Sequence, residues 1–213
     1  MVRDKKAIVT GITGQDGAHL SNQLLQEGVR VFGTFRRGSH HKTWRLDELG
    51  ITDKLTLIEA QLSEPINLVT ILNEIQPDFV FHLAGASFIS DSFRYPVSAF
   101  ELNTIGTANL LEACKVACKG AKIFFASSSE IFGGSKQNLP LNEESLSLPL
   151  NPYGVSKLAA NQLVKIYRDC YDMNCCSGIL FNHEGPLRSR QFVTRKISFN
   201  LARLRLLGGE SIK

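Results

Sequence analysis

The chain has 213 residues, a length that suits one domain or one domain with part of a second. Its net charge of +4 is modest and is not concentrated in a tail, which favours an anionic small molecule over a nucleic acid as ligand. No apolar run is long enough to cross a bilayer, and the first residues lack the apolar segment of a signal peptide. The sequence therefore predicts a cytoplasmic protein of ordinary globular composition that binds no membrane.

The five cysteines, at positions 114, 118, 170, 175 and 176, lack the paired spacing and the accompanying histidines of a zinc site. Most of them lie in segments typical of helices or strands, where a free thiol behaves as a small apolar residue. We therefore expect no metal centre, and mostly buried thiols in a reducing compartment.

The first predicted elements are a strand at 7–10, the glycine-rich turn Gly11-Ile-Thr-Gly-Gln-Asp-Gly17, and a helix with Leu20, Leu24 and Leu25 on one face. Glycines let the backbone turn sharply and approach a pyrophosphate, which then lies at the positive end of the helix dipole. The order of strand, turn and helix predicts a dinucleotide site. An ordinary tight turn is the alternative.

A second strand at 29–35 ends in Arg36-Arg37. In a dinucleotide-binding fold an acidic residue at this point binds the ribose 2′-hydroxyl of NAD, whereas cations neutralise the 2′-phosphate of NADP. The two arginines favour NADP, and a solvated basic loop is the alternative.

Further strands are expected at 54–60, 79–84, 122–126 and 175–180, separated by helices at 65–77, 96–119 and 153–170. Strands that alternate with helices predict an α/β fold with a doubly wound parallel sheet of the Rossmann type. His82 lies inside a nearly continuous apolar strand and is expected to be a hydrogen-bonded core residue rather than a catalyst. Asn103 either faces the active site or has an amide that is exposed or capped.

Candidate catalytic residues follow the strand at 122–126. Tyr153 and Lys157 are four residues apart on a predicted helix and so share one face. An ammonium beside a phenol favours the phenolate, which can exchange protons near neutral pH. Ser128, at the strand end, can complete the hydrogen-bonded set, and Glu130 adds a second acid/base that simple alcohol oxidation does not require.

Taken together, these segments resemble the GDP-mannose 4,6-dehydratases, a branch of the extended short-chain dehydrogenase/reductases. The matching sequences are Gly11 to Gly17, Arg36-Arg37, Ser128 to Glu130, Tyr153 with Lys157, Gly178-Ile-Leu-Phe-Asn-His-Glu184 and Phe192-Val-Thr-Arg-Lys-Ile197. The resemblance covers the whole chain and implies a Rossmann domain at 1–181 and part of a substrate-binding region at 182–213. Because family members continue well past Lys213, the chain is expected to be a fragment or a truncated product.

The resemblance implies that GDP-D-mannose becomes GDP-4-dehydro-6-deoxy-D-mannose through transient NADPH. Tyr153 would take the 4-hydroxyl proton, and Lys157 would lower the tyrosine pKa and hold the nicotinamide ribose. Glu130 would remove the C5 proton and assist loss of water. Ser128, at a position that is usually threonine in the family, would bind the 4-oxygen.

Binding positions carry over in the same way. Those implied for the cofactor are Gly11, Thr13, Gly14, Gln15, Asp16, Gly17, Arg36, Arg37, Leu62, Leu83, Ala84, Tyr153 and Lys157. Those implied for the substrate are Ser87, Ser128, Asn182, Arg188, Val193 and Lys196. The chain has Gln61, Ala86, Phe88 and Leu187 where the family usually has Asp, Gln, His and Arg. These differences bear on the choice of sugar more than on the type of reaction.

Two other functions stay open at this point. One is a reductase or epimerase on a related nucleotide sugar, in which Glu130 is incidental, and the other is a catalytically silent nucleotide-binding or assembly module. The resemblance implies a homodimer through the helices at 96–119 and 153–170, or a homotetramer through the Arg36-Arg37 loop. The same helices could instead cover the sheet of a monomer.

Overall fold

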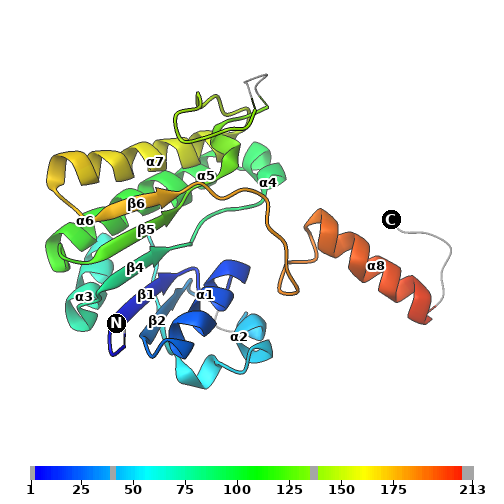
Figure 1. Cartoon of the computed structure of the whole chain (residues 1–213), viewed down its shortest axis with the longest axis horizontal. Coiled ribbons are helices and arrows are strands. Elements are labelled where there is room, and N and C mark those ends of the chain that lie inside the picture. The colour runs from blue at the N-terminus through cyan, green and yellow to red at the C-terminus, as the bar shows by residue number, and fades with distance from the viewer. Residues whose placement is uncertain (1–2, 39–41, 135–138, 208–213) are drawn as a thin grey trace. The chain divides into compact units, whose positions relative to one another are not determined.

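The computed structural model describes residues 3–38, 42–134 and 139–207 (Figure 1). The chain divides into two compact units, Met1–Phe181 and Asn182–Lys213. The first unit is a sheet covered by helices, and the second contains a single described helix, α8 (Val193–Leu207).

The described part of the first unit has six parallel strands, which confirms the predicted doubly wound α/β fold. The strands are β1 (Lys6–Thr10), β2 (Arg30–Phe35), β3 (Thr56–Glu59), β4 (Phe79–His82), β5 (Lys122–Ala126) and β6 (Cys175–Gly178). Their spatial order is β3-β2-β1-β4-β5-β6, so the winding direction reverses between β1 and β4. Folds of this kind bind ligands at the carboxyl edge of the sheet beside such a reversal.

The helices of the first unit return the chain between the strands (Figure 1). They are α1 (Gln15–Gln26), α2 (Trp44–Glu48), α3 (Pro65–Ile75), α4 (Ile89–Arg94), α5 (Pro96–Phe100), α6 (Gly106–Ala117) and α7 (Pro152–Tyr171). On α1 the most buried residues are Gly17, Ala18 and Ser21, while the predicted leucine face is only partly buried. The helices α2 and α4 were not expected, because each is too short to show a clear period.

A cross-strand row of apolar side chains builds the core on one face of the sheet. Ile8 of β1 pairs with Val80 of β4, which pairs with Ile123 of β5, which pairs with Cys175 of β6. This row packs with buried side chains of α3, α6 and α7 in one continuous apolar cluster. Because the strands are parallel and in register, the same pairing brings their carboxyl ends to one edge.

The helix predicted at 96–119 is interrupted. A π-helical turn at Glu101–Ile105 separates α5 from α6, and the Gly106 amide bonds to the Glu101 carbonyl instead of continuing the α-helical ladder. A π-turn inserts one extra residue into the helix and rotates the side chains that follow it. Asn103, at the centre of this turn, is consequently buried, with 1% of its surface exposed.

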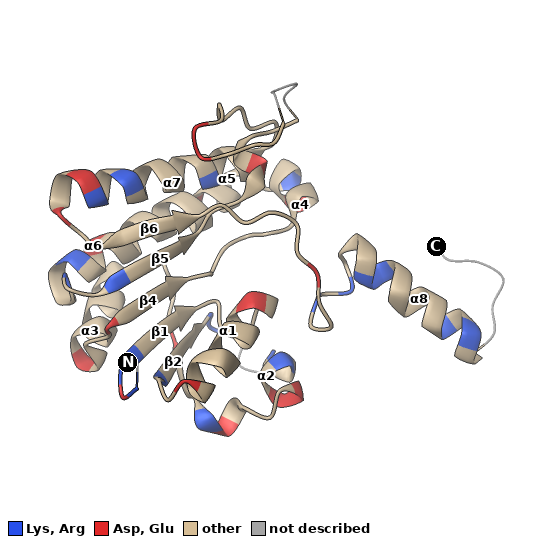
Figure 2. Cartoon of the chain, viewed as in Figure 1, with Lys and Arg blue, Asp and Glu red and all other residues tan. Residues whose placement is uncertain are grey.

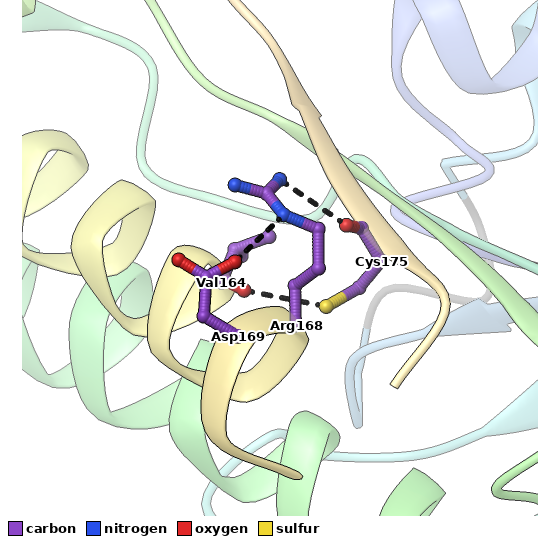
Figure 3. Close-up of polar contacts among 4 residues, drawn as sticks. All are labelled: Val164, Arg168, Asp169 and Cys175. Atoms are coloured by element: carbon purple, nitrogen blue, oxygen red, sulfur yellow. Dashed lines mark hydrogen bonds and ion pairs between the residues drawn. The ribbon is translucent and has the colours of Figure 1, made fainter. Parts of the chain in front are cut away.

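The edge strand β6 is attached to α7 by polar contacts at Cys175 (Figure 3). The Cys175 thiol donates to the Val164 carbonyl at 3.3 Å, and Arg168 donates from Nη1 to the Cys175 carbonyl at 3.5 Å. Burial raises the pKa of this thiol, so it stays protonated and can act as the donor. As expected, most cysteines are buried, namely 114, 118 and 175, whereas Cys170 and Cys176 are exposed.

In the second unit, Glu184 connects the preceding turn to the start of α8. Its carboxylate accepts from the Thr194 hydroxyl at 2.5 Å and forms an ion pair with Arg188 at 3.3 Å. The helix α8 contains several basic residues and no acidic residue (Figure 2). Among the helices that the structure describes, none combines the length and the apolar character that a membrane crossing requires.

Candidate active site

Close approach of two backbone segments explains the glycine turn after β1. A Cβ on Gly11 would lie 2.8 Å from the Ala84 Cα, and the φ of Gly11 is +71°. A Cβ on Gly17 would lie 2.5 Å from the Gly11 carbonyl oxygen. Since Cβ atoms essentially never come this close to backbone, glycine is required at both positions, and the turn brings Gly11 against Leu83 and Ala84 at the end of β4.

The first turn of α1 fits an anionic group. The N-cap of α1 is Gly14, which has no side chain to cap the first amides of the helix. Arg45 of α2 supports the turn from the other side by donating to the Thr13 carbonyl at 2.9 Å. A glycine-lined helix N-terminus of this kind suits the pyrophosphate of a dinucleotide.

The two arginines after β2 differ in their surroundings. Arg37 forms ion pairs with Glu59, at the end of β3, and with Glu64, at distances of 3.1 and 3.6 Å. Arg36 is exposed and has no ion-pair partner among the residues that the structure describes. The pairing of Arg37 could not be expected from the sequence, because its partners follow it by more than twenty positions.

The catalytic candidates converge where β5 ends. Ser128 begins a 3-10 turn (Ser129–Ile131), and its hydroxyl oxygen accepts from the Glu130 amide at 3.3 Å. The end of β6 and the segment after it run alongside, since the Ser127 and Ser129 amides bond to the carbonyls of Gly178 and Leu180. These backbone bonds fix the path of the chain that presents Ser128 and Glu130.

Asn151 joins Glu130 to the first turn of α7. Its Oδ1 accepts from the Gly154 amide at 2.7 Å and so caps the helix, while its Nδ2 donates to the Glu130 carboxylate at 2.7 Å. A Cβ on Gly154 would lie only 2.6 Å from the Glu130 carbonyl oxygen, so the turn at Glu130 packs directly on the helix beside Tyr153. The sequence interpretation missed Asn151, although an asparagine before Pro152 is a helix-start signal.

Lys157 is buried beneath this arrangement. Its Nζ donates to the Ala126 carbonyl at 2.8 Å and lies 4.8 Å from the centre of the Phe125 ring. Burial lowers the pKa of Lys157 from 10.5 to about 8. Tyr153 is buried one helical turn earlier on the same helix. The ammonium is thus held at Ala126, the last residue of β5, two residues before Ser128.

Asn103 connects the loop after β4 to α7. Its Oδ1 accepts from the Ala86 amide at 2.8 Å, and its Nδ2 donates to the Ala86 carbonyl at 3.3 Å and to the Ser156 hydroxyl at 2.9 Å. A Cβ on Gly85 would lie 2.8 Å from Asn103 Oδ1 and 3.3 Å from Lys157 Nζ. Of the two orientations that the sequence left open, the structure has the inward one.

The remaining candidates are distributed over both units. Leu62 is buried, and its carbonyl accepts from Asn109 of α6 at 2.7 Å. Ser87 is exposed on the loop after β4. The second unit holds the other predicted substrate positions, with Val193 and Lys196 in the first turn of α8 and with Asn182 and Arg188 before it.

The comparisons with known proteins identify the family. A family profile described as GDP-mannose 4,6 dehydratase matches residues 8–211. The chain belongs to this family. A GDP-mannose 4,6-dehydratase of Yersinia enterocolitica is 39% identical over 95% of this chain, and one of Homo sapiens is 37% identical over 94%. Each alignment covers 56% of the relative, so the chain spans somewhat more than half of these GDP-mannose 4,6-dehydratases.

Solved structures outside the GDP-mannose 4,6-dehydratase family have the same fold. A UDP-N-acetylglucosamine 4-epimerase from Methanobrevibacter ruminantium matches with a TM-score of 0.82 and 29% identity, over 94% of this chain and 64% of its own. A UDP-glucuronic acid 4-epimerase from Bacillus cereus, solved with UDP-glucuronic acid and NAD, matches with a TM-score of 0.81 and 26% identity, over 93% and 63%. The Rossmann fold of the extended short-chain dehydrogenase/reductases is therefore established for the chain.

Proposed function

We propose that this chain carries the catalytic and cofactor-binding part of an NADP-dependent GDP-mannose 4,6-dehydratase. The substrate would be GDP-D-mannose and the product GDP-4-dehydro-6-deoxy-D-mannose. The observation that carries the proposal is the contact between Asn151 and Glu130, which holds a second acid/base at the helix that bears Tyr153 and Lys157. A dehydratase needs that carboxylate, whereas a simple alcohol dehydrogenase does not.

Two residues, Tyr153 and Glu130, carry out the proton transfers. When bound, NADP supplies the hydride acceptor for C4 of the hexose and returns the hydride to C6. The Lys157 ammonium favours the phenolate of Tyr153, which accepts the 4-hydroxyl proton. Ser128 donates a hydrogen bond to the 4-oxygen as it becomes a carbonyl. The ketone acidifies the neighbouring C5 proton, which Glu130 removes and passes to the 6-hydroxyl as that group leaves as water. Tyr153 would then return its proton to C5 as the hydride reaches C6.

The proposed cofactor site occupies the carboxyl edge of β1, β2 and β4. The glycine turn and the first turn of α1 would hold the pyrophosphate, and Leu62, Leu83 and Ala84 would line the adenosine and nicotinamide portions. Arg36 would bind the 2′-phosphate, because Arg37 is already paired with Glu59 and Glu64. This arrangement supports NADP over NAD.

The second unit would bind the GDP portion of the substrate. We assign contacts with the GDP portion to Asn182, Arg188, Val193 and Lys196, and a contact with the sugar to Ser87. The basic character of α8 suits a diphosphate. Residues 1–181 would thus form the dinucleotide-binding domain and residues 182–213 part of the substrate-binding region, in a cytoplasmic enzyme.

Product analysis tests the proposal. The chain is incubated with GDP-mannose and NADP, and the expected product is a 4-keto-6-deoxy nucleotide sugar. In Glu130→Gln, hydride transfer from C4 should continue, with NADPH detected by its absorbance, while elimination of water stops. A chain that binds NADP and GDP-mannose and forms neither NADPH nor a keto sugar is not a dehydratase.

A 4-epimerase is the second candidate, because solved epimerases have the same fold at TM-scores of 0.81 and 0.82. An epimerase oxidises and reduces at C4 alone and has no use for a base at C5. The Glu130→Gln variant separates the two functions. An epimerase would keep its full activity in this variant and would yield a C4 epimer without loss of water.

We also propose that the chain forms a homodimer, which could pair further into a tetramer. The helices α5 and α7 lie side by side (Figure 1). Both helices and the π-turn between α5 and α6 carry exposed apolar side chains. The exposed apolar residues are Val97, Phe100, Ile105, Val155 and Ile166. Exposed apolar side chains on neighbouring elements suit an interface between subunits.

A further inference from the structure

A buried histidine forms a continuous hydrogen-bond chain beneath the proposed site. Thr10 Oγ1 accepts from the Ala84 amide at 3.2 Å and lies 2.7 Å from His82 Nδ1. His82 Nε2 lies 3.0 Å from Thr107 Oγ1, and Thr107 donates to the Asn103 carbonyl at 2.6 Å. The imidazole and both hydroxyls are buried, with at most 2% of each residue exposed. Each of these side-chain polar atoms therefore has its hydrogen-bond partner within this hydrogen-bond chain and not in solvent.

The two ends fix the direction of the chain. The Ala84 amide can only donate and the Asn103 carbonyl can only accept. Thr107 must give its single hydroxyl proton to Asn103, so it must receive one from His82 Nε2. Thr10 in turn must give its proton to His82 Nδ1. The ring must therefore donate from Nε2 and accept at Nδ1. Only the neutral imidazole with its proton on Nε2 does both.

The surroundings of the ring favour this uncharged state. Burial, together with the positive charge of Lys157, lowers the pKa of His82 from 6.5 to about 3. The ring packs against Phe125, with centroids 5.6 Å apart. The imidazole thus stays neutral across the range in which an unburied histidine would titrate.

The chain connects the two halves of the site. At one end Thr10 is followed directly by Gly11, and Ala84 is the residue that Gly11 contacts. At the other end is the π-turn, which directs the Asn103 side chain toward Ala86 and Ser156. The Thr107 hydroxyl donates to the carbonyl of Asn103, a residue of the π-turn. The π-turn and the hydrogen-bond chain through His82 therefore support each other.

We propose that His82 is a positioning residue which, as the neutral Nε2–H imidazole, holds the cofactor turn in a fixed relation to Asn103 and to the helix that bears Tyr153 and Lys157. The inference rests on the proposed function in one respect, that the glycine turn binds the cofactor. A substitution that breaks the hydrogen-bond chain should therefore weaken cofactor binding even when the substituted residue does not contact the cofactor.

The ring state of His82 is tested by nitrogen-15 NMR of the full chain labelled at histidine, with His82→Gln used to assign the signals. The expected spectrum shows a protonated Nε2 and an unprotonated Nδ1, unchanged from pH 8 to about pH 5. A proton on Nδ1, or titration near an ordinary histidine pKa, overturns the proposal. This measurement requires neither cofactor nor activity.

The coupling is tested with isosteric variants of the two threonines. Thr10→Val and Thr107→Val each break the chain, and each should weaken NADP binding about tenfold. The double variant should weaken it by about the same factor rather than about a hundredfold, because both changes break one chain. Thr107→Ser, which keeps the hydroxyl, should bind as the parent does, and so should Thr70→Val, a control on the exposed face of α3.

The outcomes separate this inference from the proposed function. If the parent binds NADP and Thr107→Val binds it equally well, His82 does not position the cofactor turn. If the parent binds no NADP, the proposed cofactor is wrong. The hydrogen-bond chain is then tested by the ring state of His82 and by denaturant unfolding of the same threonine variants. Additive losses of stability in the double variant overturn the proposal.

Discussion

The side-chain amide of Asn151 lies between the α7 backbone and the Glu130 carboxylate, 2.7 Å from each. One residue thus caps the helix that carries Tyr153 and also holds the Glu130 carboxylate, which the proposed loss of water requires. The position of Glu130 is in this way tied to the helix start rather than to a loop. The two functions of Asn151 can be separated by substitution.

Asn151→Ser should keep the cap and lose the contact with Glu130. A serine oxygen can accept from the Gly154 amide, so the free energy of unfolding should stay within about 0.5 kcal/mol of the parent, whereas Asn151→Ala should lose about 1 kcal/mol. Both variants should eliminate water about tenfold more slowly while hydride transfer from C4 is retained. Single-turnover assays of NADPH and of the keto product, together with denaturant unfolding, measure both effects. Asn142→Ser, in an exposed turn, is the control. Equal losses in both chemical steps would show that Asn151 acts on the whole site.

Arg36 and Arg37 should differ in their effect on the cofactor. Arg36→Ala removes the unpaired cation and should weaken NADP binding by tenfold or more, roughly the contribution of a hydrogen bond to a charged group, while NAD binding is unchanged. Arg37→Ala removes a side chain already paired with Glu59 and Glu64 and should have a smaller effect on the preference. Calorimetric titration with both cofactors measures this. A larger loss of NADP preference in Arg37→Ala would reverse the assignment.

The lowered pKa of Lys157 predicts that the protein becomes more stable as the pH rises into the alkaline range. Its pKa is lowered from 10.5 to about 8 by burial, so between these values the unfolded chain binds more protons than the folded chain. The free energy of unfolding should therefore rise with pH through this window, by at most roughly 3 kcal/mol. Below it, both states are charged and the burial penalty is complete. The increment is measured as the difference between the parent and Lys157→Met in urea unfolding, and identical pH profiles would contradict it.

Tyr167 and Glu112 join α7 to α6, and Lys115 bonds to the same carboxylate at 2.6 Å. These two hydrogen bonds, from Lys115 first and then from Tyr167, lower the pKa of Glu112, so the stabilisation is present above its unfolded pKa and is lost as pH falls through the folded value. Tyr167→Phe should lose about 1 kcal/mol of stability at neutral pH and little at about pH 3. Thermal unfolding at the two pH values checks this, and an unchanged loss in acid would argue against the contact.

The exposed apolar side chains of α5 and α7 predict a subunit interface. Ile166→Asp should prevent formation of the proposed dimer, because dimerisation would bury the charge of the aspartate at the interface. Ile66→Asp, on the exposed face of α3, is the matched control and should leave the assembly unchanged. Light scattering measures both. A parent chain that is monomeric at all concentrations would remove the proposal.

The sequence predicted those parts of the site that depend on local order. The strand at 122–126 and the spacing of Tyr153 and Lys157 follow from apolar runs and helical period, and the structure has the strand at those residues and both side chains on α7. Asn103 could not be oriented, because the π-turn changes the helical period at that residue. The partners of Arg37 lie on β3 and beyond it, and only the folded sheet brings them together.

The bonds between Asn103 and Ala86 use both backbone groups of Ala86 and none of its side chain. Any residue except proline, which lacks the donating amide, can therefore make both bonds at position 86. Gly85, confined by Asn103 and Lys157, has no such freedom. The side chain at position 86 can thus change without moving the Lys157 ammonium, whereas any side chain at position 85 would displace it or the Asn103 amide.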